Sequence, residues 1–157
     1  VLQHALRYVE SEEGSPYDVL LLLDPTSLAR KPGDITSALD RLLNCSEADG
    51  VIGVSEPDFS PIWHCVVEEQ GWMVDLMEDA KRYERRQDVP PVYWINGALY
   101  LWRTALVRAE GISWRQSGRY LVHRMPDLGA MSIDTPEQFR RAELLVNDGL
   151  VAFPWLK

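Results

Sequence analysis

The chain has 157 residues, of which 24 are acidic and 16 are basic, and hydrophobic residues make up 46% of it. This length and composition predict one globular domain with its own core, and the formal net charge of −8 argues against a general nucleic-acid binder, which needs a basic face. We find no apolar run near the roughly 18 residues of a membrane helix and no secretory-signal pattern. We therefore expect a cytoplasmic protein, with Cys45 and Cys65 as reduced thiols.

The first third of the chain has the pattern of an α/β unit. Apolar residues at helical spacing predict a helix over residues 1–13. The run "YDVLLLLDPTS" at 17–27 is typical of a strand buried on both faces, as in parallel sheets. A helix from Ile35 to Leu43, with Asp34 as its N-cap, leads to a second buried strand at 50–56. A strand, a helix and a strand joined by one crossover form a βαβ unit.

The middle of the chain has a different pattern. "PIWHCVVEE" and "WMVDLM", separated by Gln70-Gly71, predict an antiparallel hairpin. After a charged stretch, the aromatic run from Val92 to Trp102 predicts a strand. A short helix at 103–109 and a short strand at 119–125 are expected to follow. The order of elements therefore indicates an α/β sheet with a small antiparallel excursion.

The segment "DTPEQFRRAELLVNDG" carries the clearest helix signal. Thr135 occupies the N-cap position, Pro136 follows at the first helical position, and Gln138 completes a capping box. Gly149 is expected to end the helix.

Polar residues follow the first predicted strand. Asp24, Thr26, Ser27 and Arg30 would lie at its carboxyl end, the edge at which open α/β sheets bind ligands. A carboxylate, two hydroxyls and a guanidinium could hold a sugar, a base edge or a phosphate there. An ordinary turn, closed by a bond from the aspartate side chain, is the alternative.

Asp134 ends the "MSID" segment, just before the capped helix. A carboxylate at a strand end can hold Mg²⁺ while substrate phosphates complete its coordination. Alternatively it stabilises the helix N-terminus. A second carboxylate two residues earlier would make a metal pair, but that residue is Ser132.

The stretch "RRQDVPPVYWINGALY" at 85–100 holds two further candidates. Arg85 and Arg86 could clamp an anion, although a solvated basic loop is the simpler interpretation. Asn96-Gly97 interrupts the aromatic strand as a bulge or a hairpin turn, and a glycine there also lets a ligand approach the backbone.

Three segments together resemble the acylneuraminate cytidylyltransferases, which make CMP-sialic acid and related CMP-sugars. "LLLDPTSLAR" at 21–30 is similar to the family's Leu-Leu-Gln-Pro-Thr-Ser-Pro-Leu-Arg segment. "RRQDVPPVYWINGALY" is similar to its Arg-Arg-Gln-x-Leu-Pro run followed by Asn-Gly-Ala-Ile-Tyr. "MSIDTPEQFRRAE" at 131–143 is similar to its Ile-Asp-Ile-Asp-Thr segment.

This resemblance implies a fold and a reaction. The fold would be a Rossmann-like nucleotidyltransferase three-layer α/β sheet, formed by a single domain over residues 1–157, with an insert at about 57–115 through which two subunits pair as a homodimer. The implied reaction is attack of a hydroxyl of an acidic sugar on the α-phosphate of CTP, with release of pyrophosphate and help from Mg²⁺.

The resemblance also implies roles for single residues. Arg86 and Asp134 would be the catalytic residues: Arg86 would face the sugar carboxylate, and Asp134 would be the Mg²⁺ ligand. The remaining substrate-binding residues would be Asp24, Thr26, Ser27, Arg30, Gln87, Asn96 and Tyr100.

The sequence departs from the family pattern at several points. A basic, Gly-rich nucleotide loop precedes the first motif in the family, so we expect this domain to be N-terminally incomplete. Asp24 replaces a glutamine, Ser132 replaces the first aspartate of the metal pair, and Trp63 stands where a lysine is frequent. Two alternatives follow: a catalytically incomplete dimerising or sugar-binding module of the same fold, or a relative that uses another nucleotide or an uncharged sugar.

Overall fold

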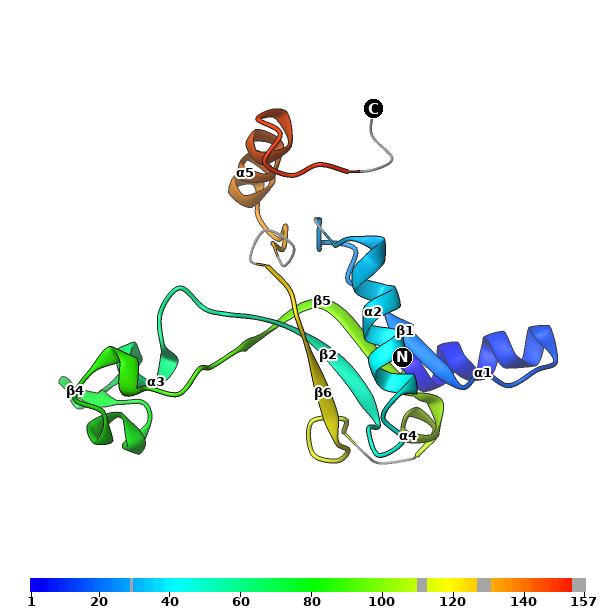
Figure 1. Ribbon diagram of the computed structural model, residues 1–157, viewed down its shortest axis with the longest axis horizontal. Helices are drawn as coiled ribbons and strands as arrows, with labels where there is room; N and C mark the ends of the chain where they lie inside the picture. The colour runs from blue at the N-terminus through cyan, green and yellow to red at the C-terminus, as the bar shows by residue number, and fades with distance from the viewer. Residues whose placement is uncertain (29, 110–112, 127–130, 154–157) are drawn as a thin grey trace.

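The computed structural model describes residues 1–28, 30–109, 113–126 and 131–153. Its elements follow the predicted order with few exceptions (Figure 1). The helices and strands are α1 (Leu2–Glu13), β1 (Val19–Leu22), α2 (Pro32–Leu43), β2 (Gly50–Ser55), α3 (Pro61–His64), β3 (Val66–Glu69), β4 (Trp72–Asp75), β5 (Trp94–Arg103), α4 (Thr104–Arg108), β6 (Tyr120–Arg124) and α5 (Pro136–Asn147), with short 3₁₀ helices η1 (Glu78–Arg82) and η2 (Arg86–Asp88) between β4 and β5.

The main sheet is mixed and has the strand order β1-β5-β2-β6. β5 is antiparallel to both β1 and β2, whereas β2 and β6 are parallel. β1 and β2 therefore run in the same direction on either side of β5. The expected crossover through α2 is present, with an additional strand between its two ends.

β1 corrects one expectation. It is not buried on both faces within a parallel sheet, because among the described strands it pairs with β5 alone and leaves Leu21 and Leu22 exposed. A short apolar run reports only that a strand is hydrophobic, and it does not identify the neighbouring strand. In contrast, all six residues of β2 are buried, as predicted.

Helix α2 covers one face of the sheet. Its buried side chains Ala38 and Leu42 pack in one cluster with Val51 of β2 and with Leu99 and Leu101 of β5. Full burial of a side chain of leucine size stabilises the folded state by about 1.5–3 kcal/mol. This cluster therefore holds α2 and the Leu99–Leu101 part of β5 together.

The opposite face holds a second cluster. Ile52, Val54 and Trp102 are buried there, and partly buried side chains from α1, α4 and the loop before β6 pack against them. Tyr100 stacks on Trp102 with ring centroids 5.5 Å apart. β5 therefore supplies both cores, with Leu99 and Leu101 in one and Tyr100 and Trp102 in the other.

The start of α2 differs from the prediction in one detail. Lys31 is the N-cap and Pro32 occupies the first turn, so Asp34 lies at the third helical position. Its Oδ2 accepts a hydrogen bond from the Lys31 backbone N–H at 2.8 Å. Asp34 still accepts a backbone hydrogen bond at the start of the helix, although it lies within the first turn and not at the N-cap position.

The segment between β2 and β5 leaves the main sheet (Figure 1). β3 and β4 form the predicted hairpin, and their Gln70-Gly71 turn has positive φ at both residues, 54° and 85°, as two-residue hairpin turns favour. Pro61–His64 forms a helical turn instead of the first part of a strand, since Pro61 begins it. β5, which lies within the expected insert of about 57–115, belongs to the main sheet.

Helix α5 begins as predicted. The Thr135 side chain accepts a hydrogen bond from the Gln138 backbone at 3.2 Å, and the Gln138 side chain accepts one from the Thr135 backbone at 2.9 Å. Gly149, with φ of 72°, follows the helix end. No helix in the described ranges is long and apolar enough to cross a membrane.

Candidate functional site

Two of the predicted motifs meet in space. The loop after β1 pairs with the segment before α5 through an antiparallel bridge between Ser27 and Ser132. The Ile133 N–H donates to the Thr26 carbonyl at 3.0 Å, and the Leu28 N–H donates to the Met131 carbonyl at 3.3 Å. Backbone hydrogen bonds therefore hold "DPTS" against "MSID".

Side chains extend this contact into a polar chain. Asp24 Oδ1 accepts hydrogen bonds from the Thr26 hydroxyl at 2.8 Å and from the Thr26 backbone N–H at 3.0 Å. The Thr26 and Ser132 hydroxyl oxygens are 3.0 Å apart, and the Ser132 hydroxyl donates to Asp134 Oδ2 at 2.8 Å. Each hydroxyl has one proton, so when Thr26 donates to Asp24 and Ser132 donates to Asp134, the two hydroxyl oxygens are in contact without a hydrogen bond between them. The two hydroxyls thus place the two carboxylates in one region. We call Asp24, Thr26, Ser132 and Asp134 the two-carboxylate cluster.

Electrostatics keep Asp24 ionised. The backbone and side-chain hydrogen bonds from Thr26 hold the pKa of Asp24 below its usual value. Burial opposes them to a smaller extent, and the positive charge of Arg30 adds a still smaller lowering. The turn that the sequence offered as an alternative is therefore present. It presents an ionised carboxylate at the site, so the two interpretations are compatible.

Arg30 lies beside the cluster without an ion pair to the Asp24 carboxylate in the described part of the chain. Its Nη1 donates to the carbonyl of Ala98 at 2.6 Å and, at 3.4 Å, to that of Asp24. The guanidinium therefore ties the loop after β1 to β5, next to the Asn96-Gly97 interruption.

The donor set of the cluster suits Mg²⁺. Mg²⁺ prefers oxygen ligands and is usually bound by one or two carboxylates, with water and substrate phosphates completing the octahedron. Asp134 offers a carboxylate at an exposed position, and Ser132 holds it through one of its oxygens. No group of three or more His, Cys, Asp or Glu residues in the described ranges could hold a metal ion, so any cation here would depend on further oxygen ligands.

Asn96 is occupied by structural contacts. Only 4% of it is exposed. Its Nδ2 donates to the Ser55 hydroxyl at 3.1 Å, its Oδ1 accepts from the Ala98 N–H at 3.0 Å, and Ser55 in turn donates to the Met125 carbonyl at 2.9 Å. The interruption is a shift in the β2–β5 register rather than a hairpin turn, with Gly97 at φ of 76°.

Gly97 leaves room beside the cluster. A side-chain carbon at this position would lie 3.8 Å from Asp24 Oδ2. Tyr100 lies three residues further along β5. Burial raises its pKa; the positive charge of Arg115 opposes this effect, and the negative charge of Asp24 adds to it. The Asn-Gly stretch thus adjoins Asp24, although the Asn96 side chain itself points into the core.

The structure does not bring the arginine motif to the two-carboxylate cluster. Arg86 and Gln87 belong to η2, in the segment that projects from the sheet, away from the place where β1 ends and α5 begins (Figure 1). Arg85 is paired with Asp88 at 3.0 Å, whereas Arg86 lines a cavity of about 190 Å³ together with Phe59. Of the two arginines, Arg86 is therefore the one that lines a cavity.

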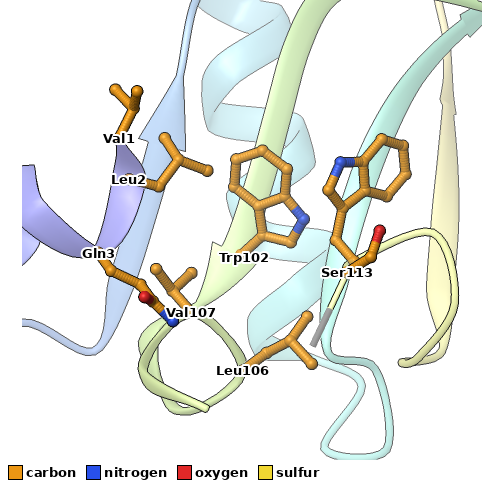
Figure 2. Close-up of a pocket in the computed structure, with 8 residues that line it drawn as sticks. Val1, Leu2, Gln3, Trp102, Leu106, Val107 and Ser113 are labelled. Carbon is orange, nitrogen blue, oxygen red and sulfur yellow. The ribbon is translucent and has the colours of Figure 1, made fainter. Parts of the chain in front are cut away.

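A cavity of about 490 Å³ lies elsewhere, and none of the predicted site residues lines it. Figure 2 shows Trp102, Leu106 and Leu2 around it, and Trp114 also contributes. Its lining is mostly apolar and has no titratable side chain among the described residues. We place the candidate site at the two-carboxylate cluster instead, because charged and hydrogen-bonding groups converge there.

From the sequence, Ser132 was recognised only as a missing carboxylate, and its hydrogen bond to Asp134 and its contact with Thr26 were not anticipated. The available signal was the "PTS" and "MSID" pair, since hydroxyl residues on facing segments can bond to each other. Ser55, which anchors Asn96, carried no recognisable signal.

Comparison with known proteins gives independent information. No protein-family model matches the chain. The N-acylneuraminate cytidylyltransferase of Streptococcus agalactiae serotype V is 27% identical over 119 residues, which are 76% of this chain and 28% of that protein. The CMP-N,N'-diacetyllegionaminic acid synthase of Legionella pneumophila is 32% identical over 87 residues, which are 54% of this chain and 35% of that protein.

The chain therefore spans about a third of the length of the curated relatives it matches. The relatives carry the names that the three motifs led us to expect. The resemblance is confirmed: the chain is similar in sequence to N-acylneuraminate cytidylyltransferases and to a CMP-N,N'-diacetyllegionaminic acid synthase.

Proposed function

We propose that the chain is part of a cytidylyltransferase that activates an acidic nonulosonic sugar with CTP, forming a CMP-sugar and pyrophosphate. The observation that carries the proposal is the similarity to enzymes named for this chemistry. The meeting of two of the resembling motifs as the two-carboxylate cluster supports it. A Rossmann-like fold is part of the proposal. Its support is the mixed α/β sheet with a crossover through α2.

In the proposed reaction a sugar hydroxyl attacks the α-phosphorus of CTP. A new P–O bond forms to the sugar, the bond between the α- and β-phosphates breaks, and the electron pair leaves with pyrophosphate. The hydroxyl proton passes to a base. Asp24 suits an electrostatic role better than that of this base, because its lowered pKa makes it a weak proton acceptor.

Mg²⁺ would supply charge neutralisation for the phosphates. Asp134 would hold it, and the Ser132 hydroxyl would orient the Asp134 carboxylate through the 2.8 Å hydrogen bond. Thr26, Ser27 and Arg30 would shape the loop that carries Asp24. Arg86 and Gln87, on the projecting segment, would bind the acidic sugar, and Tyr100 would line the site beside Gly97.

A homodimer is proposed on the exposed hairpin. Trp72 and Met73 of β4 are 77% and 76% exposed, and Val66, Val67 and Val74 are exposed beside them. An exposed apolar patch of this kind is typical of an interaction surface.

The reaction is tested by pyrophosphate release. The protein that contains this chain is incubated with CTP, Mg²⁺ and each of a panel of nonulosonic acids. Release that requires one of these acids supports the proposal. If an acid binds and the fold is intact, but no acid in the panel gives release, the cytidylyltransferase proposal is contradicted and the sugar-binding module becomes the better description.

Arg86 is tested separately by calorimetric titration with the acid that binds best. Arg86→Ala should weaken binding by about 1.5–3 kcal/mol, because a hydrogen bond between charged groups is lost. Arg85→Ala is the matched control, since Arg85 is paired with Asp88 in the protein. Equal effects of the two substitutions would remove Arg86 from the sugar site.

A further inference from the structure

The cavity of about 490 Å³ adjoins the second core cluster, away from the two-carboxylate cluster. Its walls come from the start of α1, from β5, from α4 and from the segment before β6 (Figure 2). Small-molecule sites commonly have volumes of about 300–1,000 Å³ and mostly apolar walls with a few polar groups. The cavity therefore has the size and the lining of a site for a small organic molecule.

Two indole rings form the aromatic wall of this cavity. Trp102 is 2% exposed, and Tyr100 stacks on it with ring centroids 5.5 Å apart and an interplanar angle of 15°. The Trp114 ring lies 6.1 Å from that of Trp102 and meets the Tyr120 ring edge to face at 5.8 Å. Because neighbouring rings already hold Trp102 in one orientation, a ligand would not have to order this side of the wall.

The indole N–H of Trp102 is a donor without an acceptor. Its Nε1 is a buried atom that has no hydrogen-bond partner among the described residues. An indole nitrogen can only donate, and buried donors in folded proteins nearly always have an acceptor. Figure 2 shows the nitrogen of Trp102 on the side of the ring toward Ser113, another of the lining residues. The wall thus carries a polar group for which a ligand could supply the acceptor.

Trp114 is the part of the wall that can move. It lies in a turn between α4 and β6 and is partly exposed, whereas Trp102 is fixed within a central strand. The Trp102 nitrogen is closed to water in this arrangement. A ligand would therefore reach it once the Trp114 ring shifts outward, and a turn permits such a shift more readily than a strand does.

The charges beside the cavity indicate the kind of ligand. The Arg115 guanidinium carbon lies 5.0 Å from the centroid of the Trp114 ring. The lining residues that the structure describes include no carboxylate. Aromatic walls can attract cations, but a cationic ligand here would meet a positive charge already placed over the outer ring. A neutral or anionic ligand fits these surroundings better.

We propose that this cavity binds a planar bicyclic aromatic compound that carries a carbonyl or carboxylate oxygen. The ring system packs against Leu106 and the indole wall, and the oxygen accepts a hydrogen bond from Trp102 Nε1. The site is separate from the proposed reaction, because neither Arg86 nor a member of the two-carboxylate cluster is among the described lining residues.

Acetylnaphthalene is the probe, and isopropylnaphthalene, which has nearly the same shape but no acceptor, is its control. Each is titrated into the ¹⁵N-labelled chain while the indole N–H signals of the six tryptophans are followed by NMR. The signal that is missing in Trp102→Phe belongs to Trp102. Acetylnaphthalene should move this signal downfield in a saturable way. The signal of the exposed Trp72, identified through Trp72→Phe, should not move.

The dissociation constants test the hydrogen bond itself. Acetylnaphthalene should bind about twofold to tenfold more tightly than isopropylnaphthalene, which is the usual contribution of one such bond. Trp102→Phe keeps an aromatic ring and lacks the donor, so this difference between the two probes should vanish in that variant. If Trp102 contributed packing alone, the substitution would weaken both probes equally and leave their ratio unchanged.

Filling the cavity tests the location of the site. Leu106→Trp should weaken binding of both probes at least about tenfold, because the added ring occupies the space of the ligand. Leu144→Trp, which places the same side chain at an exposed position on α5, should leave the affinity unchanged. Circular dichroism establishes that each variant is folded, and Leu106→Phe makes the same test with a smaller ring if Leu106→Trp does not fold.

Three results would each overturn the inference. They are the lack of a saturable shift of the Trp102 signal in the wild-type chain, equal dissociation constants for the two probes, and unchanged affinity in the folded cavity-filling variant. Pyrophosphate release is independent of all three, so the proposed reaction can fail while the aromatic site stands, and the reverse.

Discussion

Asn96→Ala tests whether the Asn-Gly stretch serves the core. The substitution removes two hydrogen bonds, one to the Ser55 hydroxyl and one from the Ala98 N–H. The first contributes about 0.5–1.5 kcal/mol, and leaving the buried Ala98 N–H without an acceptor costs about 1–3 kcal/mol. We therefore expect the free energy of unfolding to fall by roughly 2–4 kcal/mol.

Urea unfolding followed by tryptophan fluorescence measures this loss. With an m-value of about 2 kcal/mol per molar urea, the midpoint should move down by roughly 1–2 M while the slope stays the same. Asn44→Ala is the matched control, because the Asn44 amide donates to the Asp40 carbonyl at an exposed position. That change should cost less than about 1 kcal/mol.

A loss for Asn96→Ala no larger than that of the control would refute the reasoning. A second check is a double-mutant cycle with Ser55→Ala, for which residues in one hydrogen-bond network should show a coupling of about 0.5–3 kcal/mol. Zero coupling would mean that the Asn96–Ser55 contact does not contribute to stability.

Three further outcomes are expected. Thr135→Ala should destabilise α5 by about 1 kcal/mol in urea unfolding, whereas Thr135→Ser, which keeps the cap, should not. Because Thr26 lowers the pKa of Asp24, the folded state binds fewer protons than the unfolded state near that pKa. The contribution of Asp24 to the free energy of unfolding is therefore present above the ordinary aspartate pKa, and it is lost as pH falls through the lowered pKa. The stability difference between wild type and Asp24→Asn should then shrink on acidification below about pH 4. Trp72→Glu should weaken self-association by at least about 2 kcal/mol in sedimentation equilibrium if Trp72 anchors the interface. Leu144→Glu, which changes an exposed apolar residue on α5, is the control. Equal dissociation constants for the two variants would contradict pairing through the hairpin.

The sequence was most informative where local chemistry decides the structure. Helix α5 begins with a capping box between Thr135 and Gln138, and Gly149 follows its end. Both signals depend on residues close together in the sequence, so a short pattern was sufficient to predict them. The Gln70-Gly71 turn was predictable for the same reason. β2, buried throughout, also gave the continuous apolar signal expected of a central strand.

The misassigned features depend on partners that are distant in the sequence. β1 has the composition of a central strand, but the insertion of β5 beside it gives an antiparallel pair and leaves β1 exposed. The core contacts of Asn96 could not be predicted, because its partner Ser55 lies on β2 and Ser55 in turn donates to the Met125 carbonyl just after β6. In the candidate site, the sequence predicted Asp24, Thr26 and Asp134 separately, and only the structure showed that the Thr26 and Ser132 hydroxyls bring the two carboxylates into one region.

The bridge between Ser27 and Ser132 also has a kinetic consequence. The Thr26 and Ser132 side chains are separated by 106 positions, and only a few backbone hydrogen bonds join the two segments. Closing so long a loop costs entropy before the new contacts compensate for it. We expect the β2–β5 ladder to form early and the two-carboxylate cluster to assemble late. In native-state hydrogen exchange, the Leu28 and Ile133 amides should then open more readily than those of the central strands, so access to the site would be governed by local unfolding of the C-terminal segment.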